Sequence, residues 1–280
     1  MHIITSPMAL KDLVTQWHRQ GERIGLTPTM GALHDGHLAL IRALTGKASR
    51  KIVTLFVNPT QFNNAEDFHL YPRQHEADIA LLQKTGEVDA LYIPHKEDMY
   101  PQGFSTKIFV SQFDTMLCGA DRPGHFEGVA TVVTKLFLQT QADIAAFGEK
   151  DYQQLCLIRR LVKDLNIPVE ILAVPTQREA DGLALSSRNR RLTPEQRLQA
   201  AQLPAALHAC LIDLRHHQHP LSEALARCRT TLENAGFIVH YLDLRKEETL
   251  EIAEKAEPHT RLFVAASLGN IRLIDNMPIF

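Results

Sequence analysis

The residues best suited to chemistry are two histidines, His34 and His37, which lie three positions apart in the run His-Asp-Gly-His. An apolar run at residues 24–26 precedes them and predicts a buried strand that ends at Pro28. Apolar residues at helical spacing follow Gly36 and predict a helix. In the first turn of a helix, side chains three residues apart share a face beside unpaired backbone N–H groups and the positive end of the helix dipole. This pattern predicts a phosphate site lined by imidazole groups, which exchange protons near neutral pH.

The elements around the histidines favour the same interpretation. A second apolar run at residues 51–57 follows at the distance expected for the next strand of a βαβ unit. Ligands of open parallel sheets bind at the carboxyl ends of the strands, and His34 and His37 would lie at such an end. The alternative is that each is only a turn or helix-start residue, since the chain holds 14 histidines. The glycine-rich GxxxxGK[ST] and GxGxxG loops are absent from the sequence, so an ATP site would have to use this helix.

Another candidate loop follows the apolar run at residues 144–147 and opens a helical pattern. Its Lys150 could meet a phosphate as a point charge. Asp151 could cap the helix or accept hydrogen bonds from ribose hydroxyls, and Gln154, one turn later, could face a substrate. A surface lysine and an ordinary cap aspartate are the alternative for this segment.

Two other segments offer polar groups of different kinds. Residues 183–191 combine hydroxyls, backbone amides and guanidinium groups, and Arg188 could donate two hydrogen bonds to a departing pyrophosphate. A plain surface turn is the alternative there. In the turn at residues 56–63, Gln61 could donate to a carboxylate and accept from hydroxyls, which suits a hydroxy acid.

The composition limits the classes of function. A formal charge of −2 offers no basic patch for a nucleic acid or a membrane, so small substrates are expected. The apolar runs are short, and the first residues lack the basic-then-apolar layout of a signal peptide, which predicts a soluble, cytoplasmic protein. The four cysteines form no CxxC pair, so neither a disulfide framework nor a zinc ribbon is expected.

The hydrophobic pattern predicts an α/β fold with a Rossmann-like, doubly wound parallel sheet, because strand-like and helix-like runs alternate up to residue 175. The expected strands lie near residues 23–27, 51–57, 90–93, 143–147 and 169–174, with helices at 74–85, 129–139 and 151–165. The alternation stops at Pro175 and the polar stretch after it, which predicts one domain at residues 1–175 and a second at 176–280. Helical runs at 194–215 and 221–235 and strand-like runs at 238–244, 262–266 and 271–274 make the second domain a smaller α+β domain.

Beside these local patterns, six motifs that follow one another between residues 28 and 189 carry a resemblance to a known family. They are PTMGALHDGH, FVNPTQF, YPR, RPGHFEGV, FGEKDYQQ and LALSSRN. The set resembles the pantothenate synthetase family, which are ligases of the broad HxGH nucleotidyltransferase group that join pantoate to β-alanine. The resemblance implies a Rossmann-like domain that binds ATP and pantoate, a smaller C-terminal α+β lid domain that closes to exclude water, and a homodimer.

The resemblance also implies a two-step, ATP-dependent reaction of pantothenate and coenzyme A biosynthesis. The carboxylate of (R)-pantoate attacks the α-phosphorus of ATP to give pantoyl adenylate and pyrophosphate, and the amine of β-alanine then displaces AMP. An ionised carboxylate is a poor electrophile, so the mixed anhydride supplies the leaving group that it lacks. Mg²⁺ would enter with ATP and offset charge repulsion, and no residue is assigned as its ligand.

By this resemblance, the motifs supply the residues of the site. The implied catalytic residues are His34, His37, Lys150 and Arg188, with His37 as the expected proton donor. The residues expected to bind ATP are Met30, Gly31, Ala32, Leu33, His34, Asp35, Gly36, His37, Gly148, Glu149, Lys150, Asp151, Gln177, Leu185, Ser186, Ser187 and Arg188. Gln61 and Gln154 would bind pantoate, and Gln61 would also border β-alanine.

Three other functions compete with this one. An HxGH adenylyltransferase that moves AMP onto a phosphorylated acceptor would need extra cations, whereas Gln61 and Gln154 are neutral amides. An aminoacyl-tRNA synthetase would need a basic tRNA-binding surface, which the composition does not provide. A non-catalytic nucleotide sensor would keep the fold without turnover, and the presence of both histidines argues against it.

Overall fold

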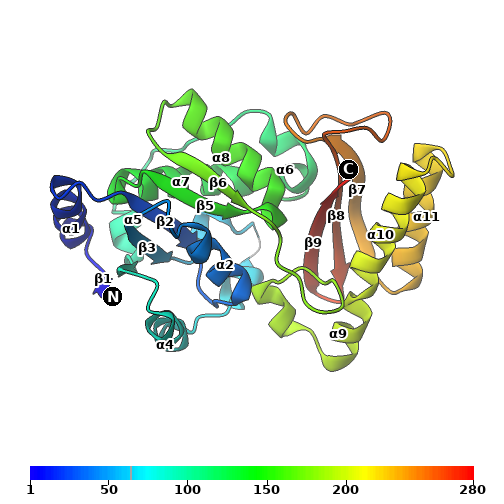
Figure 1. The fold of residues 1–280 in the computed structure, drawn as a ribbon. Helices are drawn as coiled ribbons and strands as arrows, with labels where there is room; N and C mark the ends of the chain where they lie inside the picture. The colour runs from blue at the N-terminus through cyan, green and yellow to red at the C-terminus, as the bar shows by residue number, and fades with distance from the viewer. Residues whose placement is uncertain (64) are drawn as a thin grey trace. The chain divides into compact units, whose positions relative to one another are not determined.

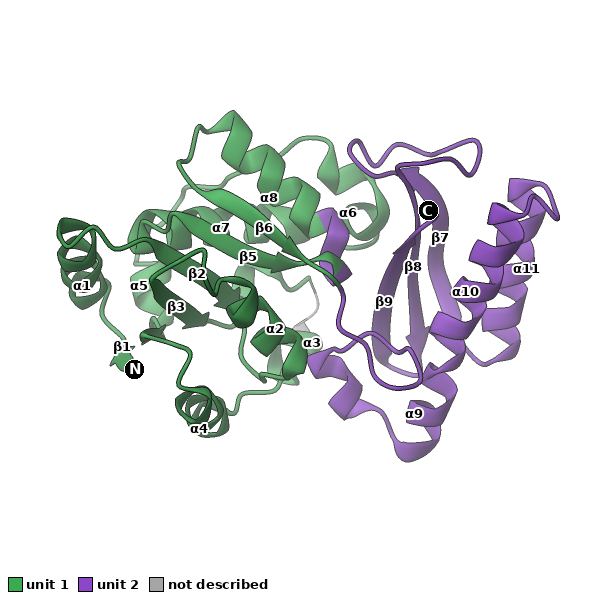
Figure 2. Ribbon diagram, viewed as in Figure 1, with its two compact units in different colours: residues 1–149, 154–175 green, residues 150–153, 176–280 purple. Residues whose placement is uncertain are grey.

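The computed structural model describes residues 1–63 and 65–280, which form two compact units (Figure 2). Unit 1 contains residues Met1–Glu149 and Gln154–Pro175, and unit 2 contains Lys150–Gln153 and Thr176–Phe280. The short segment Lys150–Gln153 belongs with unit 2, although the alternation of the sequence predicts it within the first domain. Its hydrogen bonds and ring contacts with a sheet of unit 2 are the reason.

Unit 1 is built on a six-stranded sheet in which all neighbouring strands are parallel (Figure 1). Its strands are β1 (His2–Ile4), β2 (Ile24–Thr29), β3 (Arg50–Leu55), β4 (Ala90–Tyr92), β5 (Ile144–Gly148) and β6 (Glu170–Val174). In the order β1-β4-β3-β2-β5-β6, the chain moves outward from β2 to one side and from β5 to the other. This doubly wound sheet confirms the predicted fold class. The reversal point between β2 and β5 is where such sheets bind ligands.

Helices cover both faces of this sheet. They are α1 (Pro7–Arg19), α2 (Asp35–Ala43), α3 (Ala65–His69), α4 (His75–Thr85), α5 (Lys96–Met99), α6 (Leu117–Asp121), α7 (His125–Thr140) and most of α8 (Tyr152–Asp164), with 3₁₀ turns at Pro59–Gln61 and Phe113–Thr115. α2 and α4 pack on one face, where Leu38 and Leu82 join Val53 and Leu91 in a buried cluster. Right-handed crossovers place α1, α7 and α8 on the opposite face (Figure 1).

Strand β2 runs through Pro28 to Thr29, so the prediction that it ends at Pro28 is wrong. The pairing of β2 with β5 covers only Gly25 and Leu26, and Pro28 lies beyond it. On the other side, the Thr29 carbonyl accepts from the Phe56 amide (3.0 Å). Because backbone groups alternate in direction along a strand, the Pro28 nitrogen turns away from β3, toward the side where β5 no longer pairs. A missing N–H costs little at that position.

The sequence pattern leaves out β1 and the first helix, α1. The side chain of Ser6 caps α1, and Pro7 occupies its first position. Both are helix-start signals that the sequence contains. Buried residues then repeat at helical spacing, with Leu10, Val14 and Trp17 facing the core.

Unit 2 contains a three-stranded antiparallel sheet in the order β7-β8-β9. Its strands are β7 (Ile238–Lys246), β8 (Thr260–Leu268) and β9 (Ile271–Pro278), its helices are α9 (Pro194–Ala200), α10 (Gln202–Arg215) and α11 (Leu221–Asn234), and its 3₁₀ turns lie at Glu149–Asp151, shared with unit 1, and at Ser187–Arg191. α10 and α11 pack on one face of the sheet, where Leu207, Leu211 and Leu232 lie with Leu262 and Val264 in one buried cluster. This agrees with the predicted smaller α+β architecture.

The single helix predicted over residues 194–215 is two helices, α9 and α10, which meet at Ala201. Pro204 explains the break, because it has no N–H for the carbonyl of Ala200 and its ring would clash with that carbonyl in a continuous helix. In the first turn of α10, Pro204 meets neither problem, since the first helical N–H groups lack partners within the helix.

Candidate active site

Helix α2 begins after the loop at residues 30–33, at the carboxyl end of β2, and both histidines lie at its start. His34 is the N-cap residue, and its Nδ1 accepts a hydrogen bond from the Gly36 amide (3.1 Å). His37 is the third helical residue, and its Nδ1 accepts from the His34 amide (3.3 Å). The centroids of the two rings are 4.1 Å apart. The histidines therefore form a reciprocal capping box, a role usually taken by Ser or Thr with Glu or Gln.

This capping box changes the expected chemistry of the helix start. The amides of His34 and Gly36, predicted to be unpaired, are bonded to imidazole nitrogens. Because each Nδ1 accepts a hydrogen bond, the ring hydrogen of a neutral imidazole lies on Nε2. An imidazolium carries hydrogen on both nitrogens and would lose the bond to the backbone. The geometry therefore favours neutral rings that donate hydrogen bonds from Nε2.

The loop before the histidines is held by a buried carboxylate that the sequence pattern does not single out. Asp78, in α4, is 2% exposed, and its two oxygens accept from the amides of Ala32 and Leu33, both at 2.8 Å. Gly31 and Ala32 both have positive φ, at 83° and 52°, a conformation that costs energy for alanine. A Cβ on Gly31 would lie 3.0 Å from an Asp78 oxygen. One side chain thus keeps this predicted ATP-binding loop in a strained shape.

Gln61, which the resemblance predicts to bind pantoate, lies in a buried polar cluster. It is 9% exposed in the 3₁₀ turn Pro59–Gln61, and its Nε2 lies 3.2 Å from the sulfur of Met30, another predicted site residue. Asn58 donates to Gln61 Oε1 (3.1 Å), which fixes the direction of the Gln61 amide. Asn58 also accepts from the Tyr100 hydroxyl (2.7 Å). Burial raises the pKa of Tyr100, so this hydroxyl stays a donor.

The start of α7, part of the RPGHFEGV motif, holds the backbone of Gln61. The Gln61 carbonyl accepts from His125 Nδ1 (2.8 Å) and from Arg122 (3.3 Å). Gly128 lies against the same turn, and a Cβ there would be 2.5 Å from the Thr60 carbonyl oxygen. The motif therefore positions the turn that carries Gln61.

The FGEKDYQQ loop divides between the two units. Gly148 ends β5 and, with Glu149, belongs to unit 1, whereas Lys150 and Asp151 belong to unit 2. The Lys150 side chain is 18% exposed, and its Nζ lies 3.6 Å from a carboxylate oxygen of Asp151. Gln154, again in unit 1, is half-buried in the first turn of α8.

The predicted residues of the last motif lie together in unit 2. The Leu185 amide donates to the Gln177 carbonyl (2.9 Å), which brings the two ends of this loop side by side. Ser186 then caps the 3₁₀ turn, and its Oγ accepts from the Arg188 amide (3.2 Å). Ser187 is buried. The local structure thus gathers these backbone and hydroxyl groups in one loop of unit 2.

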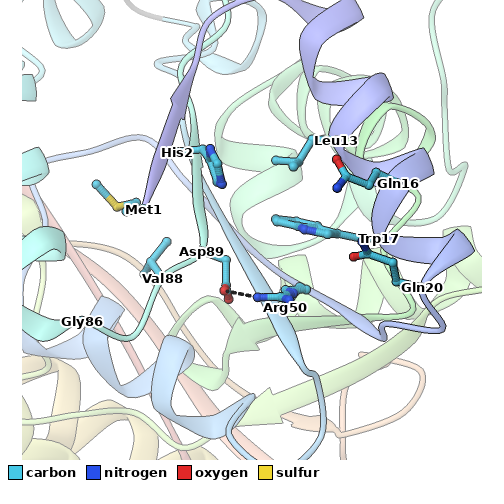
Figure 3. A pocket seen from close by; sticks show the side chains of 10 residues that line it. All are labelled: Met1, His2, Leu13, Gln16, Trp17, Gln20, Arg50, Gly86, Val88 and Asp89. Atoms are coloured by element: carbon cyan, nitrogen blue, oxygen red, sulfur yellow. Dashed lines mark hydrogen bonds and ion pairs between the residues drawn. The ribbon is translucent and has the colours of Figure 1, made fainter.

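A surface cavity in unit 1 lies away from these residues (Figure 3). Its lining includes Trp17, Arg50 at the start of β3 and Asp89 just before β4. These are the amino ends of the parallel strands, opposite the edge that carries His34. The carboxylate oxygens of Asp89 and Glu22 lie 3.2 Å and 2.7 Å from the Arg50 guanidinium nitrogens. They raise the pKa of Arg50, which stays charged, and their negative charges balance it. We therefore do not place substrate chemistry in this cavity.

Comparison with known proteins decides among the candidate functions. The family described as pantoate-beta-alanine ligase matches residues 2–278. The chain belongs to the pantoate-β-alanine ligase family. The ligase is 53% identical to the pantothenate synthetase of Chelativorans sp. (strain BNC1) over 271 residues, which cover 96% of this chain and 95% of that relative. Its fold matches the crystal structure of pantothenate synthetase from Thermus thermophilus with a TM-score of 0.93, 43% identity and full coverage of both chains.

A third relative was crystallised with ligands. The pantoate-beta-alanine ligase from Francisella tularensis, in a complex with beta-gamma ATP and beta-alanine, matches with a TM-score of 0.84 and 36% identity and covers 100% of this chain and 98% of that one. The ligase condenses pantoate with β-alanine and uses ATP. The family and the activity predicted from the six motifs are thus confirmed, and the transferase, tRNA synthetase and sensor functions are set aside.

Two negative findings apply to the part of the chain that the structure describes. There, no group of three or more His, Cys, Asp and Glu side chains is placed to hold a metal ion. No helix in residues 1–63 and 65–280 is long and apolar enough to cross a membrane. The four cysteines are free and buried, which suits a role in packing.

We expect Gly128→Ala to impair the use of pantoate by the ligase. The added methyl must push away backbone atoms of Thr60 and Gln61, and overpacking of this kind costs about 1–3 kcal/mol. Displacement of Gln61 should raise KM for pantoate by about tenfold, equivalent to about 1.4 kcal/mol. Steady-state kinetics at varied pantoate, beside Leu138→Ala on the exposed side of α7 as the control, measure this. An unchanged KM would contradict the role given to Gln61.

Proposed function

We propose that the ligase joins its substrates through a pantoyl-adenylate intermediate, with release of pyrophosphate and AMP. The observation that carries the proposal is the pair of histidine rings, 4.1 Å apart, at the start of α2 and the carboxyl end of β2. A helix start with imidazole donors suits the phosphates of ATP. β2 borders the reversal point of the sheet, where ligands of this architecture bind.

The chemistry balances in two steps. A carboxylate oxygen of pantoate attacks the α-phosphorus of ATP, and the bond from that phosphorus to the bridging oxygen of pyrophosphate breaks. The amine of β-alanine then attacks the acyl carbon, the bond from that carbon to the bridging oxygen breaks, and AMP leaves with that oxygen. The amine loses a proton as the amide forms. No covalent bond to the protein is needed.

We assign the phosphate chemistry to four side chains. His34 and His37 donate hydrogen bonds from Nε2 to phosphate oxygens, since Nδ1 of each ring accepts from the backbone. In this form His37 acts as a hydrogen-bond donor and keeps its proton, in place of the expected proton transfer. Lys150 and Arg188 supply positive charge where negative charge grows on the departing pyrophosphate.

The remaining assignments follow the local structure. The proposed ATP contacts are Met30, Gly31, Ala32, Leu33, Asp35, Gly36, Gly148, Glu149, Asp151, Gln177, Leu185, Ser186 and Ser187. The buried Gln61 amide, with its direction set by Asn58, supports a role for Gln61 in binding pantoate and in bordering β-alanine. Gln154 is the second proposed pantoate residue.

We propose Mg²⁺ as the cofactor that arrives with ATP. When bound, it neutralises charge on the phosphates. Asp78, whose carboxylate holds the loop at residues 30–33, already accepts hydrogen bonds from two amides. We propose that the magnesium ion is held chiefly by phosphate oxygens and water, as Mg²⁺ usually is at sites that bind substrate phosphates.

The proposal also covers assembly and location. We expect a homodimer in the cytoplasm, with unit 2 acting as a lid that excludes water from the adenylate. The support is the match to family members over nearly their whole length. Water exclusion matters because an acyl adenylate hydrolyses readily.

An oxygen-isotope experiment tests the intermediate. With pantoate labelled by ¹⁸O in its carboxylate, ATP and β-alanine, one labelled oxygen should appear in AMP, because the bridging oxygen leaves with the phosphate. Omission of pantoate or of β-alanine should abolish steady AMP release. Label in inorganic phosphate, with ADP as the nucleotide product, would show an acyl phosphate and overturn the proposed adenylate.

A further inference from the structure

One face of the sheet in unit 2 holds the segment Lys150–Gln153. Leu262 and Met277 belong to the cluster formed with α10 and α11, so the residues next to them in sequence, Phe263 and Asn276, point to the other face. Phe263 and Asn276 are direct partners in the register of β8 and β9. The second face of the sheet therefore presents an aromatic ring and an amide to the segment.

Asn276 binds the backbone of Lys150. Its Nδ2 donates to the Lys150 carbonyl (2.9 Å), and its Oδ1 accepts from Arg261 (2.7 Å). A guanidinium can only donate. The Asn276 oxygen must therefore face Arg261, and its NH₂ group must face Lys150. Asn276 and Arg261 are 3% and 6% exposed, so bulk water is poorly placed to replace either bond.

Arg261 is itself held by Glu247, and it contacts a second residue of the segment, Tyr152. Its Nε and Nη2 each lie 3.0 Å from Glu247 Oε1. Its guanidinium carbon lies 4.0 Å from the centre of the Tyr152 ring, a favourable cation–π geometry. Phe263 packs edge-on against the same ring, with centroids 5.9 Å apart. The segment is thus held at two places, the carbonyl of Lys150 and the ring of Tyr152.

We propose that Asn276 is a positioning residue that sets where the Lys150 ammonium reaches. This inference rests on the proposed action of Lys150 on the phosphates of ATP. A lysine has a long, flexible side chain, so the place of its ammonium depends on where its backbone is held. A displacement of about 1 Å at a reacting centre can cost about 100-fold in rate.

Asn276→Asp tests the contact with little change of shape. The carboxylate still accepts from Arg261, but it cannot donate to the Lys150 carbonyl and repels it. We expect kcat to fall about 10- to 100-fold, with KM for pantoate little changed. Arg229→Met is the matched control, because it removes a side-chain hydrogen bond to the Val239 carbonyl (3.0 Å) in the same unit. Its kcat should stay unchanged.

A double-mutant cycle with Lys150→Met separates positioning from a general structural effect. Methionine removes the ammonium but keeps the backbone carbonyl that Asn276 binds. We expect Lys150→Met alone to lower kcat strongly and Asn276→Asp to cause no further loss in that background, since its effect passes through the missing ammonium. Thermal unfolding of the same proteins should show equal shifts in midpoint for Asn276→Asp in both backgrounds.

Each outcome decides a different point. Full activity of Asn276→Asp, or an equal loss of kcat in both backgrounds, would overturn the positioning role and leave the proposed role of Lys150 in place. Full activity of Lys150→Met would overturn the proposed role of the lysine, and the inference with it. If Asn276→Asp gives no folded protein, Asn276→Ala enters the same cycle with the same two outcomes.

Discussion

His37→Ala is expected to slow pyrophosphate release in a single turnover with ATP and pantoate by about 100- to 1,000-fold, the usual loss for one preorganised donor at a site of growing charge. The variant removes the Nε2–H donor at the start of α2. It also removes the acceptor for the His34 amide (3.3 Å), and a lost helix cap costs about 1 kcal/mol. Rapid-quench kinetics measure the rate, and a urea unfolding curve measures the cap.

His37→Gln separates hydrogen-bond donation from proton transfer. Gln is a usual residue at the third position of a capping box, so its Oε1 can restore the bond to the His34 amide. Its Nε2 can donate to a phosphate but cannot transfer a proton. We expect His37→Gln to be clearly faster than His37→Ala. Equal rates in two equally stable variants would show that the proton of His37 itself moves.

Asp78→Ala is expected to have the second largest effect, on stability and on the use of ATP together. It removes the carboxylate that accepts from the buried amides of Ala32 and Leu33, and loss of a hydrogen-bond partner for a buried donor costs about 1–3 kcal/mol. The loop then loses the support for its positive φ angles. We expect KM for ATP to rise and kcat to fall, measured in steady-state kinetics beside urea unfolding.

Two variants control this experiment. Asp78→Asn keeps the shape but offers one acceptor oxygen and turns an NH₂ group toward the second amide, so its loss should lie between those of the parent and Asp78→Ala. Asp164→Ala removes a carboxylate from a surface ion pair with Arg160 (2.9 Å), which is worth about 0–1 kcal/mol. An ATP KM that is unchanged in Asp78→Ala would show that the loop keeps its form without this carboxylate.

Local patterns in the sequence were sufficient to predict the elements that carry the histidines. The apolar run before Pro28 and the helical spacing after Gly36 indicate β2 and α2, and both strands at the reversal point of the sheet were predicted. Two of the errors fall at prolines. Pro204 breaks the predicted helix for a reason visible in the sequence. Pro28 is tolerated only because β5 stops pairing before it, which depends on the neighbouring strand.

The supports of the site could not be predicted in the same way. Asp78 is 46 residues from Ala32, and Asn276 is 126 residues from Lys150. Each contact depends on which elements become neighbours in the folded chain, and an aspartate in a helix or an asparagine in a strand is typical of a surface. One signal was present at Asn276, because it and Asp275 are adjacent polar residues in a strand whose other members are mostly apolar.

The bond from Asn276 to Lys150 also imposes an order on how the ligase becomes active. Lys150 leaves the ribosome well before β9 does, so the sheet face that holds it does not yet exist. In refolding, contacts between residues so far apart also form late, because the entropy of closing the loop must be overcome first. On a chain that still lacks β9, the lysine proposed to act on ATP therefore lacks its contact with Asn276, and we expect a nascent ligase to use ATP slowly until β9 has joined the sheet.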